Sequence, residues 1–141
     1  MNHIELYIEG KTFGKSGSGF AVVMRSKHNE WKRSFAYGNY SANQSELLAA
    51  KFALLSVSNS FSDAPIKLFA KNKYVRDMLE RDDNGHYTKR VSANKEFVDG
   101  VRDLISNKSV EIIKSEGNIT TEVSKMVEDA VKNDILVDSR K

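Results

Sequence analysis

Apolar and polar residues alternate with a period of two along the first third of the chain, which is the pattern of half-buried β-strands. Ile4, Leu6 and Ile8, for example, are separated by charged or aromatic neighbours. The pattern predicts a strand over 4–9, a loop rich in small residues over 10–19, a strand over 20–24, a polar turn over 26–30 and a third strand over 31–37. Three successive strands joined by short turns predict an antiparallel meander.

The spacing of apolar residues then changes to that of amphipathic helices. A broad apolar face runs from Leu47 to Leu55, and Asn43 precedes it with Glu46 three residues later, an order typical of a helix start. Further along, the pattern predicts a short buried strand over 66–69, helices over 74–79 and 97–105, a strand over 110–113 and a last helix over 123–131. We therefore predict an α/β fold with a five-stranded mixed sheet, three strands antiparallel and then two parallel, flanked by helices.

Composition narrows the class of protein. A chain of 141 residues has room for one domain, which we expect to span residues 1–141. No apolar run reaches the roughly 18 residues of a membrane span and no signal-peptide pattern is present, so we expect no membrane association. The lack of cysteine excludes disulfides and thiolate metal sites and favours an intracellular, cytoplasmic location. A net charge of +3 permits a nucleic-acid partner without requiring one.

Four local motifs follow one another along the predicted elements. They are Tyr7-Ile8-Glu9-Gly10 at the end of the first strand, Gly19-Phe20-Ala21-Val22-Val23 in the second, Asn43-Gln44-Ser45-Glu46-Leu47-Leu48-Ala49-Ala50 at the first helix, and Leu68-Phe69-Ala70-Lys71-Asn72-Lys73-Tyr74-Val75 around the end of the buried strand. In order and in place, these motifs resemble those of type 1 ribonuclease H over residues 3–132. The resemblance implies a ribonuclease H-like fold and a relation to enzymes that cleave the RNA strand of RNA/DNA hybrids.

The chemistry of that family uses four carboxylates that hold two divalent cations, Mg²⁺ or Mn²⁺, about 4 Å apart. The resemblance places Glu9 at the first position, where the family has aspartate, and Glu46 at the second. It places Lys71 at the third position. Asn118 replaces the histidine that the family uses for proton transfer. The resemblance therefore implies a catalytic site that is altered at several of its positions.

The fourth carboxylate position depends on the register of the last helix. Glu128 occupies it at the family's usual interval after Asn118, and this register keeps the flanking Val127 and Val131 in the core. A competing register places Lys125 there, and we favour Glu128. The carboxylates that remain, Glu9, Glu46 and Glu128, would bind Mg²⁺ or Mn²⁺ only if a weak metal site persists.

The lysine at the third position decides how we interpret this site. An ammonium group a few ångströms from a divalent cation repels it and also fills a ligand position. With Lys71, three acids and one ammonium give a net charge of −2 instead of −4, so we expect the binding of two metal ions to be badly weakened. We also expect Lys71 to take the place of the metal as the counter-ion of the carboxylates.

Simpler interpretations of these residues stay open. Glu46 also fits the third helical position of a capping box that begins at Asn43. Glu9 can also be interpreted as a solvated acid at the end of a strand, and Lys71 as a lysine that extends into solvent and serves no site. A segment that corresponds to a hybrid-binding protrusion in some family members contains basic residues interspersed with acidic ones, which favours a solvated surface; the basic ones are Arg81, Lys89, Arg90 and Lys95.

We therefore expect a ribonuclease H-like domain whose catalytic site is degenerate and which acts as a nucleic-acid binding or interaction module. The expected partner is an RNA/DNA hybrid or another duplex, and no cofactor is needed. Two alternatives stay open. One is an active ribonuclease H that uses Glu9, Glu46 and Glu128 with Mg²⁺ or Mn²⁺, and the other is a protein-interaction scaffold that does not bind nucleic acid.

Overall fold

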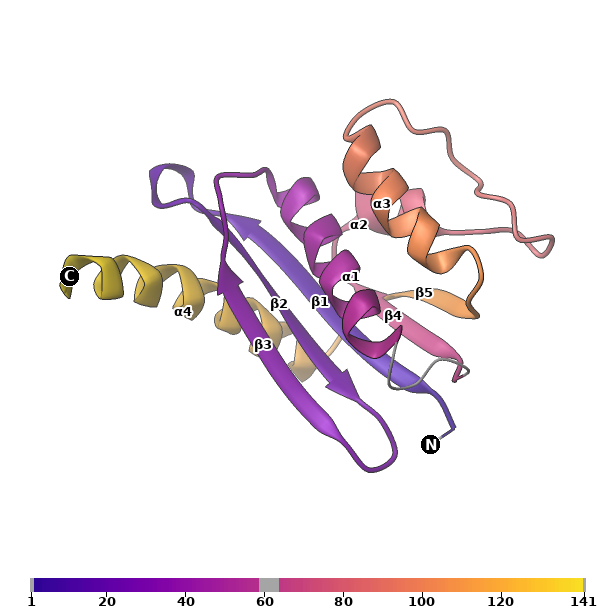
Figure 1. Cartoon of the computed structure of the whole chain (residues 1–141), viewed down its shortest axis with the longest axis horizontal. Helices are drawn as coiled ribbons and strands as arrows, with labels where there is room; N and C mark the ends of the chain where they lie inside the picture. Colours follow the sequence, from indigo (N-terminus) through magenta and orange to yellow (C-terminus); the bar gives the residue numbers. More distant parts are fainter. Residues whose placement is uncertain (1, 59–63, 141) are drawn as a thin grey trace.

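The computed structural model describes residues 2–58 and 64–140 and contains a mixed five-stranded sheet (Figure 1). The strands are β1 (Ile4–Thr12), β2 (Ser18–Arg25), β3 (Glu30–Ala36), β4 (Ile66–Ala70) and β5 (Val110–Lys114), in the spatial order β3-β2-β1-β4-β5. The pairs β1–β2 and β2–β3 are antiparallel, whereas β1–β4 and β4–β5 are parallel. This arrangement confirms the predicted fold class.

Helices cover both faces of the sheet (Figure 1). On one face lie α1 (Ala42–Ser58), α2 (Lys73–Leu79) and α3 (Lys95–Ile105), and on the other lies α4 (Asn118–Arg140). A 3₁₀ turn, η1 (Gly14–Ser16), follows β1. The predicted helices are all present, but α4 begins before its apolar pattern and ends after it, since polar residues such as Thr120 and Thr121 belong to its first turns. None of the described helices is long and apolar enough to cross a bilayer.

The first strand extends further than the sequence predicts. Residues 10–19 are expected to form a loop, but β1 continues to Thr12 and pairs there with the start of β2. Glycine and small polar residues favour turns, yet they complete an antiparallel ladder when a neighbouring strand supplies the hydrogen bonds. Because side chains alternate along a strand, Lys11 points to the same face of the sheet as Glu9.

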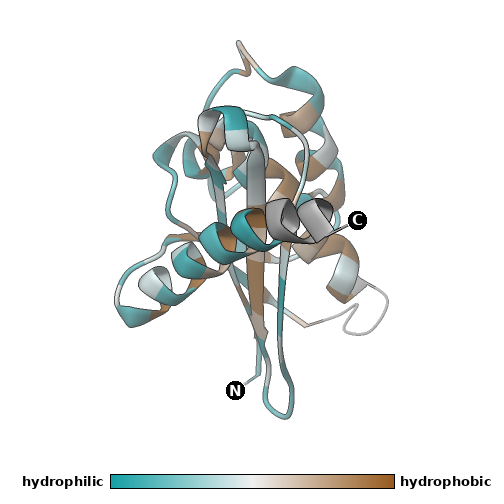
Figure 2. Cartoon of the chain, turned by 90° about the vertical axis from the view of Figure 1, so that its left-hand side faces the viewer, coloured by the Kyte–Doolittle hydropathy of each residue, from teal (hydrophilic) through white to brown (hydrophobic). Residues whose placement is uncertain are grey.

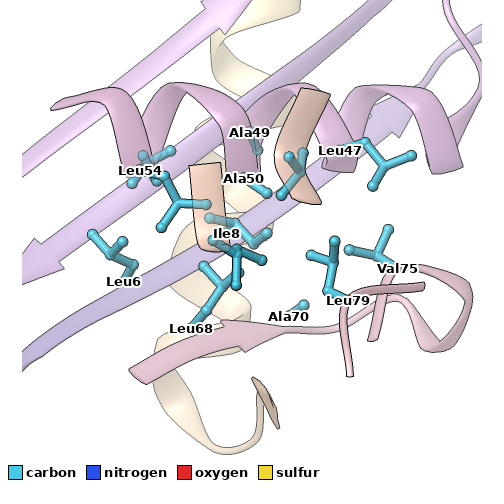
Figure 3. Close-up of a cluster of buried hydrophobic side chains, with 14 of the residues drawn as sticks. Leu6, Ile8, Leu47, Ala49, Ala50, Leu54, Leu68, Ala70, Val75 and Leu79 are labelled. Carbon is cyan, nitrogen blue, oxygen red and sulfur yellow. The ribbon is translucent and has the colours of Figure 1, made fainter. Parts of the chain in front are cut away.

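The larger part of the core lies between the sheet and α1 (Figure 3). Ala49 and Ala50 of α1 lie against the strands, and their small side chains let the helix approach the sheet closely. Larger apolar residues from β1, α1, β4 and α2 fill the space around them: Leu6, Ile8, Leu47, Leu54, Leu68, Val75 and Leu79.

A smaller apolar cluster lies on the opposite face, under α4. Its buried members are Tyr7, Ala21, Val23, Val123 and Val127. Figure 2 shows that hydrophobic residues follow the central strands, whereas the turn between β2 and β3 is hydrophilic. The two clusters hold α1 and α4 on opposite faces of β1, so that both helices pass close to its carboxyl end.

Gly10 allows β1 and α1 to meet at that end. A methyl group at this position would overlap the backbone nitrogen of Glu46 and the carbonyl carbon of Ser45. Only glycine therefore permits this approach, which brings the first turns of α1 beside Glu9.

Gly10→Ala is expected to lower the free energy of unfolding by about 3 kcal/mol or more, because the overlap is with helix backbone that cannot move without disturbing the core. Gly100→Ala is the matched control. Gly100 lies inside α3, where the nearest atom to an added methyl is 3.8 Å away, so this variant should gain about 0.5–1 kcal/mol. Urea unfolding measures both, and a Gly10→Ala protein as stable as wild type would contradict the close approach.

Candidate functional site

Two buried glutamates from different elements meet at the carboxyl end of β1. Glu9 lies on β1 and is 3% exposed, and Glu46 lies in the first turns of α1 and is 1% exposed. Both line an open depression together with Gly10, Lys71 and Asn72. Because a buried carboxylate needs hydrogen bonds or a cation, the partners of these two glutamates determine what the site can do.

The Glu46 carboxylate accepts a backbone hydrogen bond on each of its oxygens. The Gly10 N–H donates to Oε1 at 3.2 Å, and the Asn72 N–H donates to Oε2 at 2.8 Å. Burial raises the pKa of Glu46 to about 7, because the loss of water penalises the charged form more than the two hydrogen bonds favour it, and the charge of Glu9 adds to the rise. Glu46 therefore joins α1 to β1 and to the turn after β4.

The interpretation of Glu46 as a capping residue is wrong. Ser41 and Gln44 form the capping box of α1, since the side chain of each accepts a hydrogen bond at 3.1 Å from the backbone N–H of the other. Asn43 does not begin this box, and its Oδ1 accepts at 2.7 Å from the side-chain amide of Asn72. The carboxylate of Glu46 has no capping role and points toward β1 and the turn after β4.

Asn72 organises the turn after β4, although no sequence pattern singled it out as a site residue. Its side chain caps α2 by accepting from the N–H groups of Tyr74 at 2.9 Å and Val75 at 3.4 Å. Its backbone N–H and its amide group bind α1, as described above. An asparagine directly before a helix is the available signal for the capping role. Its contacts with Glu46 depend on tertiary structure.

A lysine on β1 is the cation closest to the buried acids. The Lys11 ammonium donates at 3.0 Å to Oε1 of Glu128 on α4 and lies 3.6 Å from Oε2 of Glu9. Its hydrogen bond and its charge lower the pKa of Glu128. Sequence reasoning missed Lys11 because it falls in the segment predicted as a loop. The alternation of Glu9 and Lys11 on one strand is the signal that would have found it.

Lys71 is not the counter-ion of these acids, and that expectation is wrong. Its side chain is exposed, and it forms no ion pair within 4.0 Å among the described residues. Arg76 fixes the backbone here by donating to the carbonyls of Ala70 at 3.0 Å and Lys71 at 2.7 Å. The turn therefore holds Lys71 at the rim of the depression, where its side chain is exposed and forms no ion pair with Glu9 or Glu46.

The last helix brings Glu128 to the site. Through Lys11, this residue connects α4 to Glu9 on β1. Lys125, the alternative of the competing register, is exposed and lines a neighbouring depression with Glu128. Asn118 is exposed in the first turn of α4, and its side chain makes no hydrogen bond to the part of the chain that the structure describes.

The carboxylate oxygens of this site do not fit as ligands of the two divalent cations of the ribonuclease H chemistry. Mg²⁺ needs oxygen ligands at about 2.1 Å in near-octahedral geometry. Both Glu46 oxygens accept backbone N–H groups, and Glu9 and Glu128 each present an oxygen to the Lys11 ammonium. Within residues 2–58 and 64–140, no three acidic or histidine side chains that can be described form a group able to hold a metal ion. A metal ion at these oxygens would compete with the ammonium and the backbone donors.

The chain has the ribonuclease H-like fold. No family model matches it, and no curated protein sequence does. Among solved structures it is similar to LC11-RNase H1, isolated from compost by a metagenomic approach, with a TM-score of 0.77 and 19% identity over 96% of this chain and 99% of that one. The same protein in complex with an RNA/DNA hybrid gives a TM-score of 0.75 and 18% identity, covering 94% of this chain and 99% of that one.

RNase H1 of the halophilic archaeon Halobacterium salinarum is similar as well. Its TM-score is 0.71 at 17% identity, over 93% of this chain and 98% of that one. The likeness to these structures spans nearly the whole chain and confirms the fold that the motifs predicted.

Lys11→Met is expected to lower the free energy of unfolding at pH 7 by about 1–3 kcal/mol, because buried Glu9 loses its cation while the side-chain volume is kept. The loss should stay below that of a fully buried pair since Lys11 is 26% exposed. Lys71→Met is the matched control and should stay within about 0.5 kcal/mol of wild type. Equal losses in urea unfolding would contradict the assignment of Lys11 as the counter-ion.

The stability of the protein should fall as the pH rises from about 4.5 to about 7. In this interval folded Glu46 keeps a proton that the unfolded chain has released, so the folded state binds more protons and loses stability with increasing pH. The full loss is of the order of 3 kcal/mol. Urea unfolding at several pH values measures it, and Glu46→Gln should remove this dependence.

Glu128→Gln serves as the control for the pH experiment. The pKa of Glu128 is lowered, so its own contribution is lost as the pH falls and has the opposite sign. This variant should retain the decline between pH 4.5 and 7. A decline that persists in Glu46→Gln would show that another group titrates there.

Proposed function

We propose that this protein is a ribonuclease H-like domain that binds a nucleic-acid duplex, an RNA/DNA hybrid in particular, and does not hydrolyse it. The observation that carries the proposal is the ammonium of Lys11 between the carboxylates of Glu9 and Glu128. This ammonium pairs with carboxylate oxygens that would otherwise be ligands of a divalent cation.

Hydrolysis of a phosphodiester in this fold needs a water molecule activated by a metal ion and a leaving oxygen stabilised by a second one. The three carboxylates Glu9, Glu46 and Glu128 are balanced by Lys11, with Lys71 on the rim. Three acids and two ammonium groups leave a net charge of −1, or zero when Glu46 is protonated, in place of −4. The electrostatic attraction for two divalent cations is correspondingly reduced.

The choice of an RNA/DNA hybrid rests on the similar proteins. LC11-RNase H1 is a ribonuclease H that has been solved with such a hybrid, and its chain matches this one along nearly its whole length. The hybrid is therefore the first ligand to test, with duplex DNA, duplex RNA and single strands beside it.

The proposal predicts binding without turnover. A hybrid with end-labelled RNA should be retained at low salt in the presence of EDTA, and its RNA should stay intact in Mg²⁺ and in Mn²⁺. Low salt is chosen because phosphate contacts weaken as salt rises. Gel electrophoresis of the RNA and fluorescence anisotropy of the hybrid give the two measurements from the same samples.

Glu46→Gln separates a true nuclease from a contaminating one. Cleavage by the wild type that this variant abolishes would establish an active metal-dependent ribonuclease H and overturn the proposal. Cleavage of equal rate in both proteins would come from a contaminant. Failure to retain any of the four nucleic acids at low salt would favour a protein-interaction scaffold.

A further inference from the structure

A second depression, rich in hydrogen-bond donors, adjoins the buried glutamates. It has a volume of about 340 Å³ and is lined by Lys71, Thr120, Thr121, Ser124, Lys125 and Glu128. Lys71 also lines the depression that contains Glu9 and Glu46, so the two depressions share a rim. The donor-rich depression is formed by the turn after β4 and the first turns of α4.

We propose that the donor-rich depression binds a phosphate group of a nucleic-acid backbone. The inference rests on the proposed function and extends it by assigning the residues that contact the ligand. Lys71 and Lys125 supply the charge, and the hydroxyl groups of α4 supply neutral donors. Lysine ammonium and hydroxyl groups are common partners of phosphate oxygens in nucleic-acid complexes.

The charges of Lys71 and Lys125 are available to a ligand. Both side chains are exposed, and neither forms an ion pair within 4.0 Å among the residues that the structure describes. Other lysines nearby are engaged, since Lys11 binds Glu128 and Lys73 binds Asp77 at 2.9 Å. A phosphate that approaches the depression therefore meets two ammonium groups without having to displace an acidic partner.

Among the described residues, Glu128 is the one acid that lines the donor-rich depression, and its charge is already offset. Its Oε1 accepts from the Lys11 ammonium at 3.0 Å. Lys71 and Lys125, together with that ion pair, leave the depression with a net charge of +2. On the other side of the shared rim, Glu9 and Glu46 would repel a phosphate. The charges thus favour the α4 side of Lys71 for the phosphate.

The hydroxyl groups of α4 converge on the same space. Thr121, Ser124 and Lys125 lie three and four residues apart, so they share one face of the helix. Thr120 pairs its hydroxyl with that of Ser115 at 3.1 Å, whereas the hydroxyls of Thr121 and Ser124 make no hydrogen bond to the described residues. These two hydroxyls remain free to donate to a phosphate oxygen.

The test is the binding of a labelled 18-base-pair RNA/DNA hybrid to a K71A/K125A double variant over a range of salt concentrations. The affinity should fall about tenfold at 0.1 M salt, and the slope of log K against log salt should decrease in magnitude by about one, because phosphate contacts have been removed. A K71R/K125R variant keeps both charges and should bind within about twofold of wild type.

The matched control is K27A/K108A, which removes the same charge at the opposite end of the sheet. Lys27 follows β2, and Lys108 precedes β5. This variant should keep the wild-type salt slope. Equal weakening by the two alanine variants, or unchanged binding by K71A/K125A, would overturn the assignment of the depression while leaving the proposed function in place. A wild-type protein that binds no hybrid would overturn both.

Discussion

The carboxylate of Glu46 is the interaction on which the arrangement of this end of the molecule depends. It accepts hydrogen bonds from the backbone at Gly10 and Asn72, which belong to segments far from it in sequence. These bonds hold α1 against the end of β1 and hold the turn after β4 against both. The contact with β1 is possible only because Gly10 has no side chain. A single acid thereby joins three segments of the chain at the carboxyl end of β1.

Burial of several acids at the end of a sheet requires a compensating cation, because their mutual repulsion and loss of hydration oppose folding. In a metal-dependent nuclease the divalent ions meet this need. Here Lys11 meets it from within β1, where it lies beside Glu9 on one face and reaches Glu128 on α4. Among the described residues, Glu46 has no such cation. Two backbone N–H groups bind its carboxylate, and its pKa of about 7 lets it take up a proton near neutral pH. Neither Glu9 nor Glu46 therefore depends on an added ion for its stabilisation.

The sequence predicted the fold well because hydrophobic periodicity is a local property that burial enforces. The strands around Ile4–Ile8 and the helix face around Leu47 follow directly from that periodicity. The predicted site was less accurate, since partners of charged groups depend on tertiary distances. Lys11 was missed because glycine-rich sequence concealed the end of a strand. The family resemblance places Lys71 at a carboxylate position and so predicts that it is the counter-ion. Its exposed side chain contradicts that prediction.

The same fold supports different chemistries, so function must be argued from the site. In two-metal catalysis one pair of ions both neutralises the carboxylates and binds the phosphate, and it also activates water. In the function proposed here, different residues perform the first two tasks. Lys11 neutralises the carboxylates, and the solvent-exposed Lys71 and Lys125 bind the phosphate. An ammonium group attracts a phosphate and donates hydrogen bonds, but it is not a Lewis acid and does not make bound water a nucleophile at neutral pH. In the proposed function, this division of tasks would keep the attraction for nucleic acid and remove the means of hydrolysis.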